Sequence, residues 1–391
     1  MGIIELSELT VRRGRNVVLD KWSISVDSGE VVVLKGDNGC GKSTVIEAAA
    51  GLIPLENGQS IISDQLIRDS QGRRGRTNFG LCLQDDCIMG DELVGERLLD
   101  AAGHQFDVEK LLEKWSLDHR VHDRVAMLSG GQRRRVAVLA GIIPALISEK
   151  PVGILLDEPD SGLDDKSVTM LATTLRNLAA GGHAVIVATH NDEIVSSADR
   201  VIRFPFEEVE SEPVSGKFEK IDVSKSRNPL IGHRMNLRTM AGLANNSIAG
   251  LLTLGALLAL IEPSELTDRN LVAFSLAPVL AAGLCGNPVH NLTIENRAFA
   301  WWNTKSGIPP NAFMHSIIIY ALLTTLACTA SSDIDVQLIL AGALLGIFTE
   351  GVVGLLSNAT LRLSRPNAVM IRLLTPILIL PWAIIVDMLS S

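Results

Sequence analysis

The sequence predicts two fold classes in one chain of 391 residues, an α/β domain followed by an all-α helical transmembrane domain. Three observations lead to this prediction. Up to about residue 225, charged and apolar stretches alternate as they do in a soluble protein. Unbroken β-branched runs in this part are typical of buried strands in a parallel sheet. After about residue 236, the chain carries long apolar runs with few charges.

The composition limits the class of protein. Hydrophobic residues make up 47% of the chain while the formal net charge is −9, so the apolar residues must be unevenly distributed. The acidic balance argues against nucleic acid as a partner. The five cysteines form no CxxC pair or zinc pattern, and we expect all of them to be reduced. The first residues do not resemble a secretory signal, which predicts a cytoplasmic amino-terminal domain.

The α/β domain is expected to cover residues 1–205. Its first strands, at 3–6 and 23–26, are predicted to form a small antiparallel sheet. Helical patterns separate three later buried strands, so a mostly parallel sheet covered by helices follows, with strands at 30–35, 152–157 and 184–188. Residues 85–127 are predicted to form a short helical insertion.

A glycine-rich loop directly follows the strand at 30–35. Its glycines allow main-chain N–H groups to surround phosphates, and the helix that starts near Lys42 adds the positive end of its dipole. Lys42 is predicted to reach the β- and γ-phosphates of ATP, and the Ser43 hydroxyl is predicted to ligate Mg²⁺. The loop residues predicted to bind ATP are Gly36, Asn38, Gly39, Cys40, Gly41, Lys42, Ser43 and Thr44.

Polar residues that follow other apolar strands supply the expected catalytic groups. Asp157 is predicted to reach the Mg²⁺ ion, and Glu158, the next residue, is placed to polarise the attacking water. Gln84 is predicted to sense the γ-phosphate and to ligate Mg²⁺. His190 ends another strand and is predicted to contact the γ-phosphate.

The motif Leu-Ser-Gly-Gly-Gln occupies residues 128–132, between the phosphate loop and Asp157. With these motifs, the first half of the chain resembles the ATP-binding cassette (ABC) ATPases. The resemblance implies a homodimer of two cassettes packed head to tail, in which the motif of one closes over ATP held by the other. It extends the expected ATP site to Ser129, Gly130, Gly131, Gln132 and Asp164.

Arg13 stands where such ATPases often carry an aromatic residue that stacks on adenine. Because a guanidinium plane can also stack, we hypothesise that Arg13 holds the base with weaker selectivity. The three arginines after the motif, residues 133–135, are expected to line a helix rather than to bind substrate.

Residues 206–235 are expected to form a charged linker, because apolar residues there are too sparse for a packed core. The domain 236–391 contains five stretches near or above the ~18–20 residues that cross a bilayer. Basic and acidic loops alternate between them, which predicts a cytoplasmic start and an outside carboxyl terminus in the cell membrane. The stretches lie near 239–261, 269–287, 311–330, 335–357 and 367–389.

The loop 288–310 is expected to contact the ATPase. Its apolar residues recur at helical spacing, opposite Glu295 and Arg297, at Ile294, Ala298, Trp301 and Trp302. Two interpretations stay open: an anchor with tryptophan at the level of the lipid headgroups, and a segment that transmits force.

Two charged residues fall inside the expected spans. Glu350 and Arg372 each lie about two turns from the cytoplasmic loop. An isolated charge near the bilayer centre costs on the order of 2.5–3.5 kcal/mol, so we predict that they pair. Gly342 and Gly346 form a GxxxG pattern, which favours close helix approach.

The membrane half is similar to the membrane subunit of the cytochrome c maturation haem exporter, and the ATPase half to its ATPase subunit. The similar segments are 295–299, 308–312, 346–361 and 374–381. The resemblance implies a fused ATPase and permease in which ATP hydrolysis supports haem delivery to c-type cytochromes. It also implies further membrane proteins of that system and a haem chaperone as partners. That family usually has six spans, one more than is predicted here.

Two alternatives stay open, because apolar spans say little about cargo. One is a general exporter of a drug, lipid or polymer. The other is a mechanical device that uses ATP to release a membrane partner without transport. His290 and His315 are not favoured as haem ligands, since both are expected near the cytoplasmic face.

Overall fold

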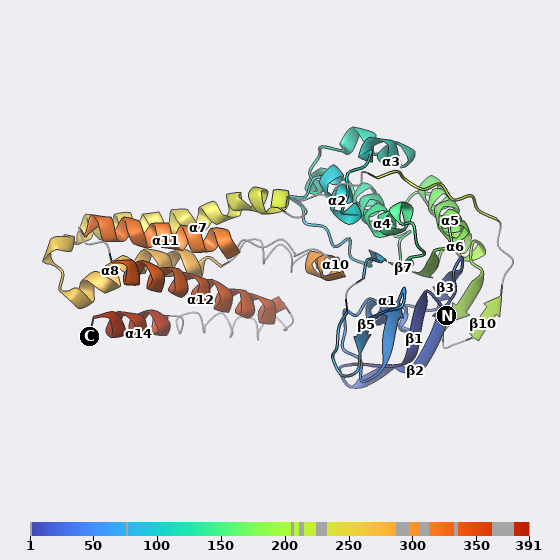
Figure 1. The fold of residues 1–391 in the computed structure, drawn as a ribbon, viewed down its shortest axis with the longest axis horizontal. Helices are drawn as coiled ribbons and strands as arrows, with labels where there is room; N and C mark the ends of the chain where they lie inside the picture. Colours follow the sequence, from blue (N-terminus) through green and yellow to red (C-terminus); the bar gives the residue numbers. More distant parts are fainter. Residues whose placement is uncertain are drawn as a thin grey trace. The chain divides into compact units, whose positions relative to one another are not determined.

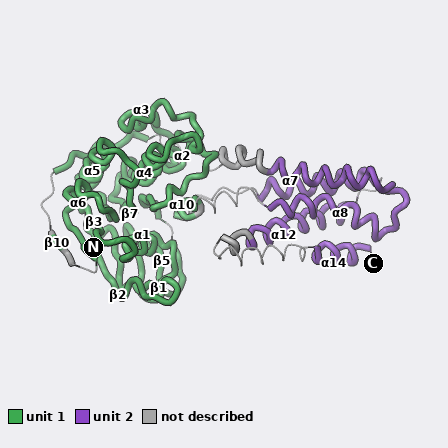
Figure 2. The backbone as a smooth tube through the Cα atoms, turned by 180° about the vertical axis from the view of Figure 1, so that it is seen from behind, with its two compact units in different colours: residues 1–232, 296–309 green, residues 233–295, 310–391 purple. Residues whose placement is uncertain are grey.

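The computed structural model describes residues 2–75, 77–204, 207–210, 215–223, 233–286, 297–304, 313–331, 335–361 and 379–390. The chain divides into two compact units (Figure 2). The first unit comprises 1–232 and 296–309, and the second comprises 233–295 and 310–391. The segment 296–309 therefore belongs to the first unit, although in the sequence it lies between helices of the second.

The first unit opens with a four-stranded antiparallel sheet in the order β2-β1-β4-β5 (Figure 1). A register shift after Leu6 moves the buried positions of β1 from even-numbered residues, Ile4 and Leu6, to odd-numbered ones, Leu9 and Val11. The predicted strands at 3–6 and 23–26 cover only the outer ends of β1 and β2, so the sheet is larger than expected. Its strands are β1 Ile4–Arg13, β2 Asn16–Val26, β4 Asn57–Ile62 and β5 Gln65–Asp69.

A six-stranded sheet in the order β10-β9-β3-β8-β7-β6 forms the centre of the first unit. All its neighbouring strands pair in parallel except β9 and β10, which confirms the prediction of a mostly parallel sheet. The parallel strands end at one edge, where ligand sites of such sheets lie. The strands are β3 Val31–Lys35, β6 Gly80–Cys82, β7 Gly153–Asp157, β8 Ala184–Ala188, β9 Arg200–Arg203 and β10 Glu207–Glu210.

Helices connect and cover this sheet, as predicted (Figure 1). The main ones are α1 Lys42–Ala49, α4 Gly130–Ile147, α5 Asp165–Ala180 and α6 Asp192–Ser196. The insertion before the Leu-Ser-Gly-Gly-Gln motif is helical, with α2 Val94–Ala102, α3 Val108–Lys114 and short 3₁₀ turns at Asp118–Arg120 and Val125–Met127. One more short helix of this unit, α10 Ala298–Thr304, comes from the segment 296–309.

Described parts of the expected linker pack on the first unit. The Phe218 ring meets the His183 ring edge-on at 5.2 Å between centroids. The Ile221 main-chain N–H donates to the Leu146 oxygen at 2.9 Å. Residues 215–223 therefore lie against the α/β fold of the first unit despite their low apolar content.

The second unit is a helical bundle whose helices run side by side (Figures 1 and 2). Among the described residues, three stretches are long and apolar enough to cross a membrane: Leu243–Leu260, Phe313–Ala330 and Val336–Leu356. The second expected span corresponds to a helix of 17 residues with Pro278 inside it. The described part of the fifth span is Ile379–Leu389, and Arg372 lies outside the described residues. The helices are α7 His233–Leu260, α8 Asp268–Leu284, α11 Phe313–Ala330, α12 Val336–Leu361 and α14 Ile379–Leu389.

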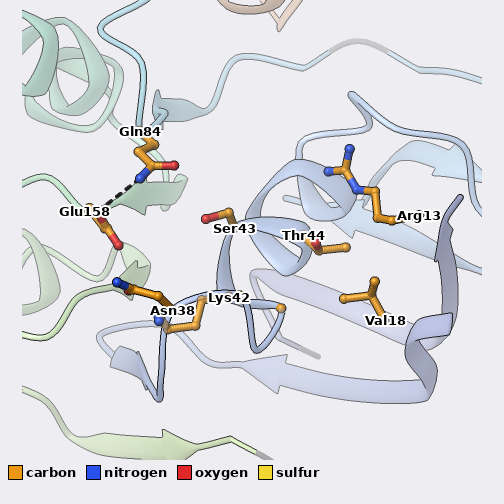
Figure 3. A pocket seen from close by; sticks show the side chains of 10 residues that line it. Arg13, Val18, Asn38, Lys42, Ser43, Thr44, Gln84 and Glu158 are labelled. Carbon is orange, nitrogen blue, oxygen red and sulfur yellow. Dashed lines mark hydrogen bonds between the residues drawn. The ribbon is translucent and has the colours of Figure 1, made fainter. Parts of the chain in front are cut away.

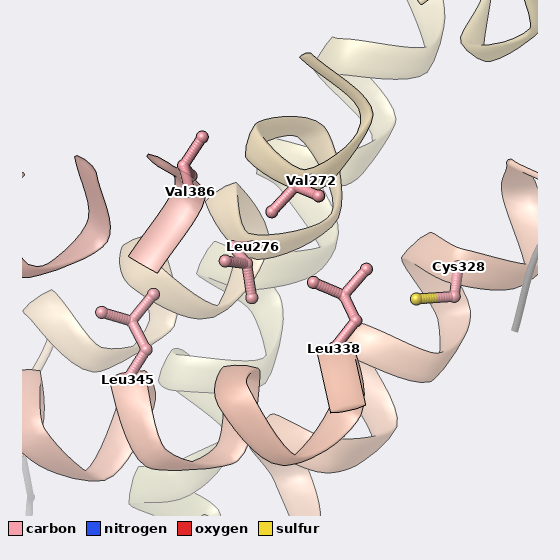
Figure 4. Close-up of a cluster of buried hydrophobic side chains, with 6 residues drawn as sticks. All are labelled: Val272, Leu276, Cys328, Leu338, Leu345 and Val386. Atoms are coloured by element: carbon pink, nitrogen blue, oxygen red, sulfur yellow. The ribbon is translucent and has the colours of Figure 1, made fainter. Parts of the chain in front are cut away.

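Small residues allow close packing in this bundle. A Cβ atom on Gly342 would lie 2.1 Å from the Thr324 hydroxyl, and one on Gly346 would lie 2.4 Å from the Tyr320 ring. The predicted close approach at the GxxxG pattern is thus confirmed, between α12 and α11. Helix α8 contacts the other four described helices of the bundle. Its buried side chains join a cluster formed by Val272, Leu276, Cys328, Leu338, Leu345 and Val386 (Figure 4).

Candidate nucleotide site

The glycine-rich loop connects β3 to the first turn of α1. Gly39 has φ 82° and Gly41 has φ 119°, a conformation that side chains other than glycine rarely adopt. Gly41 is the N-cap of α1, so the loop delivers its last residues to the positive end of the helix. The sequence therefore needs glycine at both positions to build this turn.

A pocket of about 570 Å³ opens above the loop and α1 (Figure 3). In Figure 3, Arg13 and Val18 lie on one side of Ser43 and Thr44, and Gln84 and Glu158 lie on the other. Its size is within the range of small-molecule sites. The lining residues are Arg13, Val18, Asn38, Gly39, Gly41, Lys42, Ser43, Thr44, Gln84 and Glu158. Gly36 and Cys40 belong to the loop but not to this lining.

Lys42 is held by the loop itself. Its Nζ donates to the main-chain oxygens of Gly36 at 2.6 Å and Asp37 at 3.0 Å. It also lies 3.0 Å from Nε2 of His190. The fold therefore brings His190 to Lys42, as expected if both contact the same phosphate.

Ser43 and Asp157 meet at the end of β7. The Ser43 hydroxyl donates to Oδ1 of Asp157 at 3.1 Å. Burial raises the pKa of Asp157 to about 6, opposed by the Ser43 hydrogen bond and assisted by the carboxylates of Glu158 and Glu47. A buried carboxylate beside a hydroxyl offers the hard oxygen ligands that Mg²⁺ prefers.

Glu158 and Gln84 contact each other on one side of the pocket. Gln84 Nε2 donates to Oε2 of Glu158 at 3.3 Å (Figure 3). Glu158 has φ 45°, in the left-handed region, and its N–H donates to the Ala188 oxygen at 2.7 Å. An unfavourable backbone conformation at such a position is typical of functional residues.

Arg134 is buried, with 3% of its surface exposed. It fixes the main chain at both Glu158 and Gln84. Its Nη2 donates to the oxygens of Asp157 at 2.7 Å and Glu158 at 2.6 Å. Its Nη1 donates to the oxygen of Gln84 at 3.2 Å. The sequence suggested only that Arg134 lines a helix, and its role in positioning these two segments was missed.

The Leu-Ser-Gly-Gly-Gln motif begins α4 and lies outside the pocket lining. The Ser129 hydroxyl accepts from the Gln132 N–H at 3.3 Å, and Gln132 Oε1 accepts from the Ser129 N–H at 3.0 Å. Gly131 approaches the Gly162 oxygen so closely that a Cβ atom would lie 2.8 Å from it. Asp164 caps α5 by accepting from the Ser167 N–H at 2.8 Å. The structure thus does not bring Ser129, Gly130, Gly131, Gln132 or Asp164 into the pocket of the same chain.

Comparisons with known proteins agree with this geometry. Residues 19–161 match the family model of the ABC transporter. The first unit therefore contains an ABC ATPase domain. The chain is 31% identical over 207 residues to the Nod factor export ATP-binding protein I of Sinorhizobium fredii, covering 51% of this chain and 57% of that protein.

A longer alignment reaches beyond the ABC ATPase domain. The macrolide export ATP-binding/permease protein MacB of Mannheimia succiniciproducens is 26% identical over 365 residues, covering 82% of this chain and 55% of that protein. This chain spans between 29% and 57% of the length of these and similar curated relatives. A solved ATP-binding subunit of an ABC transporter superposes with a TM-score of 0.44 at 21% identity, over 60% of this chain and 92% of that one.

The tryptophans of α10 are buried against the ABC ATPase domain. Trp301 is 2% exposed and Trp302 is 0% exposed. The guanidinium of Arg97, on α2, lies 3.4 Å from the Trp301 ring centroid. The interpretation that these rings lie among lipid headgroups is therefore wrong, because protein covers them. Ile294 lies outside the described residues.

Arg297, just before α10, adds two ion pairs. Its Nη2 donates to Glu47 Oε1 at 2.6 Å, and its Nη1 donates to Asp85 Oδ2 at 3.1 Å. Glu47 lies on α1 of the ABC ATPase domain, and Asp85 directly follows Gln84. The segment thus contacts two elements that line the pocket. Glu47 and Arg97 were not singled out in the sequence, where their only signal is a charge within an apolar helical pattern.

Proposed function

We propose that this chain is an ATP-driven membrane transporter that works as a homodimer. The observation that carries the proposal is the position of Arg297 and α10. In the sequence this segment lies between two apolar helices of the second unit, yet it docks on the ABC ATPase domain beside Gln84. A segment attached to apolar helices and seated at an ATP site can pass conformational change between them.

In the proposed ATP site, Lys42 exchanges the Gly36 and Asp37 oxygens for phosphate oxygens. Glu158 accepts the proton of the attacking water, and Gln84 and His190 orient the γ-phosphate. Mg²⁺ would be held by Ser43, Asp157 and Gln84 and would neutralise phosphate charge. The described residues contain no cluster of three or more His, Cys, Asp or Glu that could hold a metal, so phosphate and water would supply the other ligands.

We infer a homodimer because part of the expected ATP site does not line the pocket of its own chain. Ser129 caps α4, and neither Ser129 nor the first residues of this helix are among the lining residues of the pocket in the same chain. We propose that this helix end and Asp164 complete the site of a second copy. Two identical copies then form two equivalent sites, in keeping with the symmetry of most oligomers.

Membrane insertion is supported by the surface of the second unit. Large apolar side chains are exposed along three helices, including Leu252 at 69%, Leu322 at 63% and Leu344 at 67%. Such a surface suits lipid rather than water. Arg269, at the start of α8, pairs with Asp387, near the end of α14, at 3.0 Å. This pair supports a topology in which the first loop and the carboxyl terminus lie on one side of the cell membrane, with five spans and a cytoplasmic ABC ATPase domain.

Export is the favoured direction of transport, because the alignment with a macrolide export protein covers 82% of this chain. Haem delivery for cytochrome c maturation, with further membrane proteins and a haem chaperone as partners, is a finer proposal. It rests on the resemblance of segments such as 346–361 to the haem exporter. Covalent haem in c-type cytochromes should then be lost in cells whose only copy carries Glu158→Gln. Normal holo-cytochrome in such cells would rule out haem delivery and leave the general exporter as the proposed function.

The test of the proposed function is ATP hydrolysis by the full chain in lipid nanodiscs. Glu158→Gln should abolish phosphate release but keep ATP binding. Glu149→Gln, which removes a carboxylate of 89% exposure, should hydrolyse ATP like the wild type. Stimulation by a cargo molecule would support transport, whereas stimulation only by a partner protein would support the mechanical device. Equal phosphate release from wild type and Glu158→Gln would refute the assigned chemistry.

A further inference from the structure

One carboxylate on α1 is shared between two arginines from distant parts of the chain. Glu47 Oε1 accepts from Nη2 of Arg297 at 2.6 Å, and Oε2 accepts from Nη2 of Arg13. The Glu47 side chain is 9% exposed, while those of Arg13 and Arg297 are 48% and 44% exposed. Each oxygen of a nearly buried carboxylate is therefore used by a different, partly exposed cation.

The two arginines belong to different functional regions. Arg13 ends β1 and lines the nucleotide pocket on the side opposite Glu158 (Figure 3). Arg297 precedes α10 and also pairs with Asp85, next to Gln84. Glu47 does not line the pocket and is not among the residues assigned to ATP chemistry. Glu47 therefore contacts both regions.

Charge makes the two ion pairs interdependent. One negative charge is shared by two guanidinium groups, so weakening one pair strengthens the other. ATP brings several negative charges into the pocket that Arg13 lines, and these compete with Glu47 for Arg13. When Arg13 turns to the nucleotide, the whole charge of Glu47 becomes available to Arg297.

We propose that Glu47 is a positioning residue that couples occupancy of the base side of the ATP site to docking of the α10 segment. The proposal rests on the proposed function, because it requires ATP in this pocket. Bound ATP strengthens the Glu47–Arg297 pair and so tightens the segment that leads to the apolar helices. By thermodynamic reciprocity, Arg297 must strengthen ATP binding by the same factor, although it does not touch the pocket.

The experiment is a double-mutant cycle on ATP affinity. The Kd of a fluorescent, non-hydrolysable ATP analogue is measured for the full chain in lipid nanodiscs, as wild type, Arg13→Ala, Arg297→Ala and the double variant. Arg297→Ala should weaken binding by about fivefold or more, because Glu47 then holds Arg13 more tightly. In the Arg13→Ala background, the same change should have no effect.

Glu47→Gln keeps the shape of the side chain and removes its charge. In this background Arg297→Ala should leave the Kd unchanged, since no charge remains to be shared. Arg12→Ala is the matched control, because Arg12 pairs with Glu56 at similar exposures of 43% and 46% and lies outside the pocket lining. It should bind the analogue like the wild type.

The outcomes separate this inference from the proposed function. The coupling would be overturned if the wild type binds the analogue but the effects of Arg13→Ala and Arg297→Ala on Kd simply add. An unchanged Kd in Arg297→Ala would overturn it as well. Either result would leave the proposed transporter function standing. Failure of the wild type to bind the analogue would overturn the proposed function itself. If Glu47→Gln does not fold, the cycle of Arg13 and Arg297 still decides, because it keeps Glu47.

Discussion

Arg134 donates from Nη2 to the main-chain oxygen of Glu158 at 2.6 Å, and this bond fixes the main chain of the residue that carries the proposed catalytic carboxylate. The same guanidinium reaches the Gln84 oxygen at 3.2 Å. The two segments that carry Glu158 and Gln84 are therefore held by one planar, five-donor group. Only arginine has the geometry to serve both.

Arg134→Lys should reduce turnover far more than nucleotide affinity. Lysine keeps the charge but loses the fork that aligns Glu158 and Gln84, and a misplacement of about 1 Å can cost on the order of a hundredfold in rate. We expect kcat for ATP hydrolysis to fall at least tenfold, with Kd for ATP changed by less than about threefold. Steady-state ATPase assays and equilibrium binding measure the two quantities.

The control for this prediction is Arg133→Lys. Arg133 lies on the same helix as Arg134, is 43% exposed and pairs with Asp86 at 2.8 Å. It should keep wild-type turnover. Equal losses in both variants would show that turnover responds to any arginine-to-lysine change at the start of this helix, which would contradict a specific role of the backbone clamp.

Tyr320→Phe should destabilise the helix bundle. The Tyr320 hydroxyl donates to Oε2 of Glu350 at 2.6 Å, and Glu350 is only 7% exposed. Losing this bond inside an apolar bundle should lower the free energy of unfolding by about 0.6–2 kcal/mol. Reversible unfolding in bicelles measures it, with Phe348→Leu, at a side chain of 52% exposure, as the neutral control. An unchanged stability of Tyr320→Phe would mean that the bond carries no net energy.

His183 should make the ABC ATPase domain sensitive to acid. Its Nδ1 accepts from the Val152 N–H at 3.1 Å, and burial lowers its pKa to about 4 from 6.5. Between these two values the unfolded chain binds a proton that the folded chain does not, so stability falls as the pH drops from 6.5 toward 4. Above pH 6.5 the contribution of the neutral, buried His183 to the stability of the domain is fully present.

The comparison is between the wild type and His183→Gln, which keeps an acceptor but does not titrate in this range. From pH 7.5 to 5, the Tm of the wild type should fall more than that of the variant. Parallel curves would indicate that His183 does not set the acid response.

The phosphate loop, Asp157, Glu158, Gln84 and His190 could be picked out because each follows an apolar strand, a pattern that is local in the sequence. The parallel sheet followed from unbroken β-branched strands for the same reason. Arg134 could not be found, because its partners are main-chain oxygens that carry no sequence signal. The pair of Glu47 and Arg297 could not be found either, since 250 residues separate them.

The tryptophans of α10 show a further limit of pattern reasoning. An amphipathic pattern indicates an apolar face but does not say whether lipid or protein covers it. Arg97 decides between these here, because its buried guanidinium stacks on Trp301 within the first unit. The predicted pair of Glu350 and Arg372 stays a prediction, and a double swap of the two residues should rescue function that either single swap removes.

The measurement to make is the distance between spin labels on the two copies of the full chain in nanodiscs. Labels attached through Leu344→Cys on α12, in the Glu158→Gln background without the exposed Cys285, report on the second unit. Saturating ATP should shift the distance distribution. The shift should vanish in Trp301→Ala, which removes a buried anchor worth about 3–5 kcal/mol, while ATP binding persists. No shift with ATP, or the same shift in Trp301→Ala, would contradict ATP-driven movement of the membrane helices through α10.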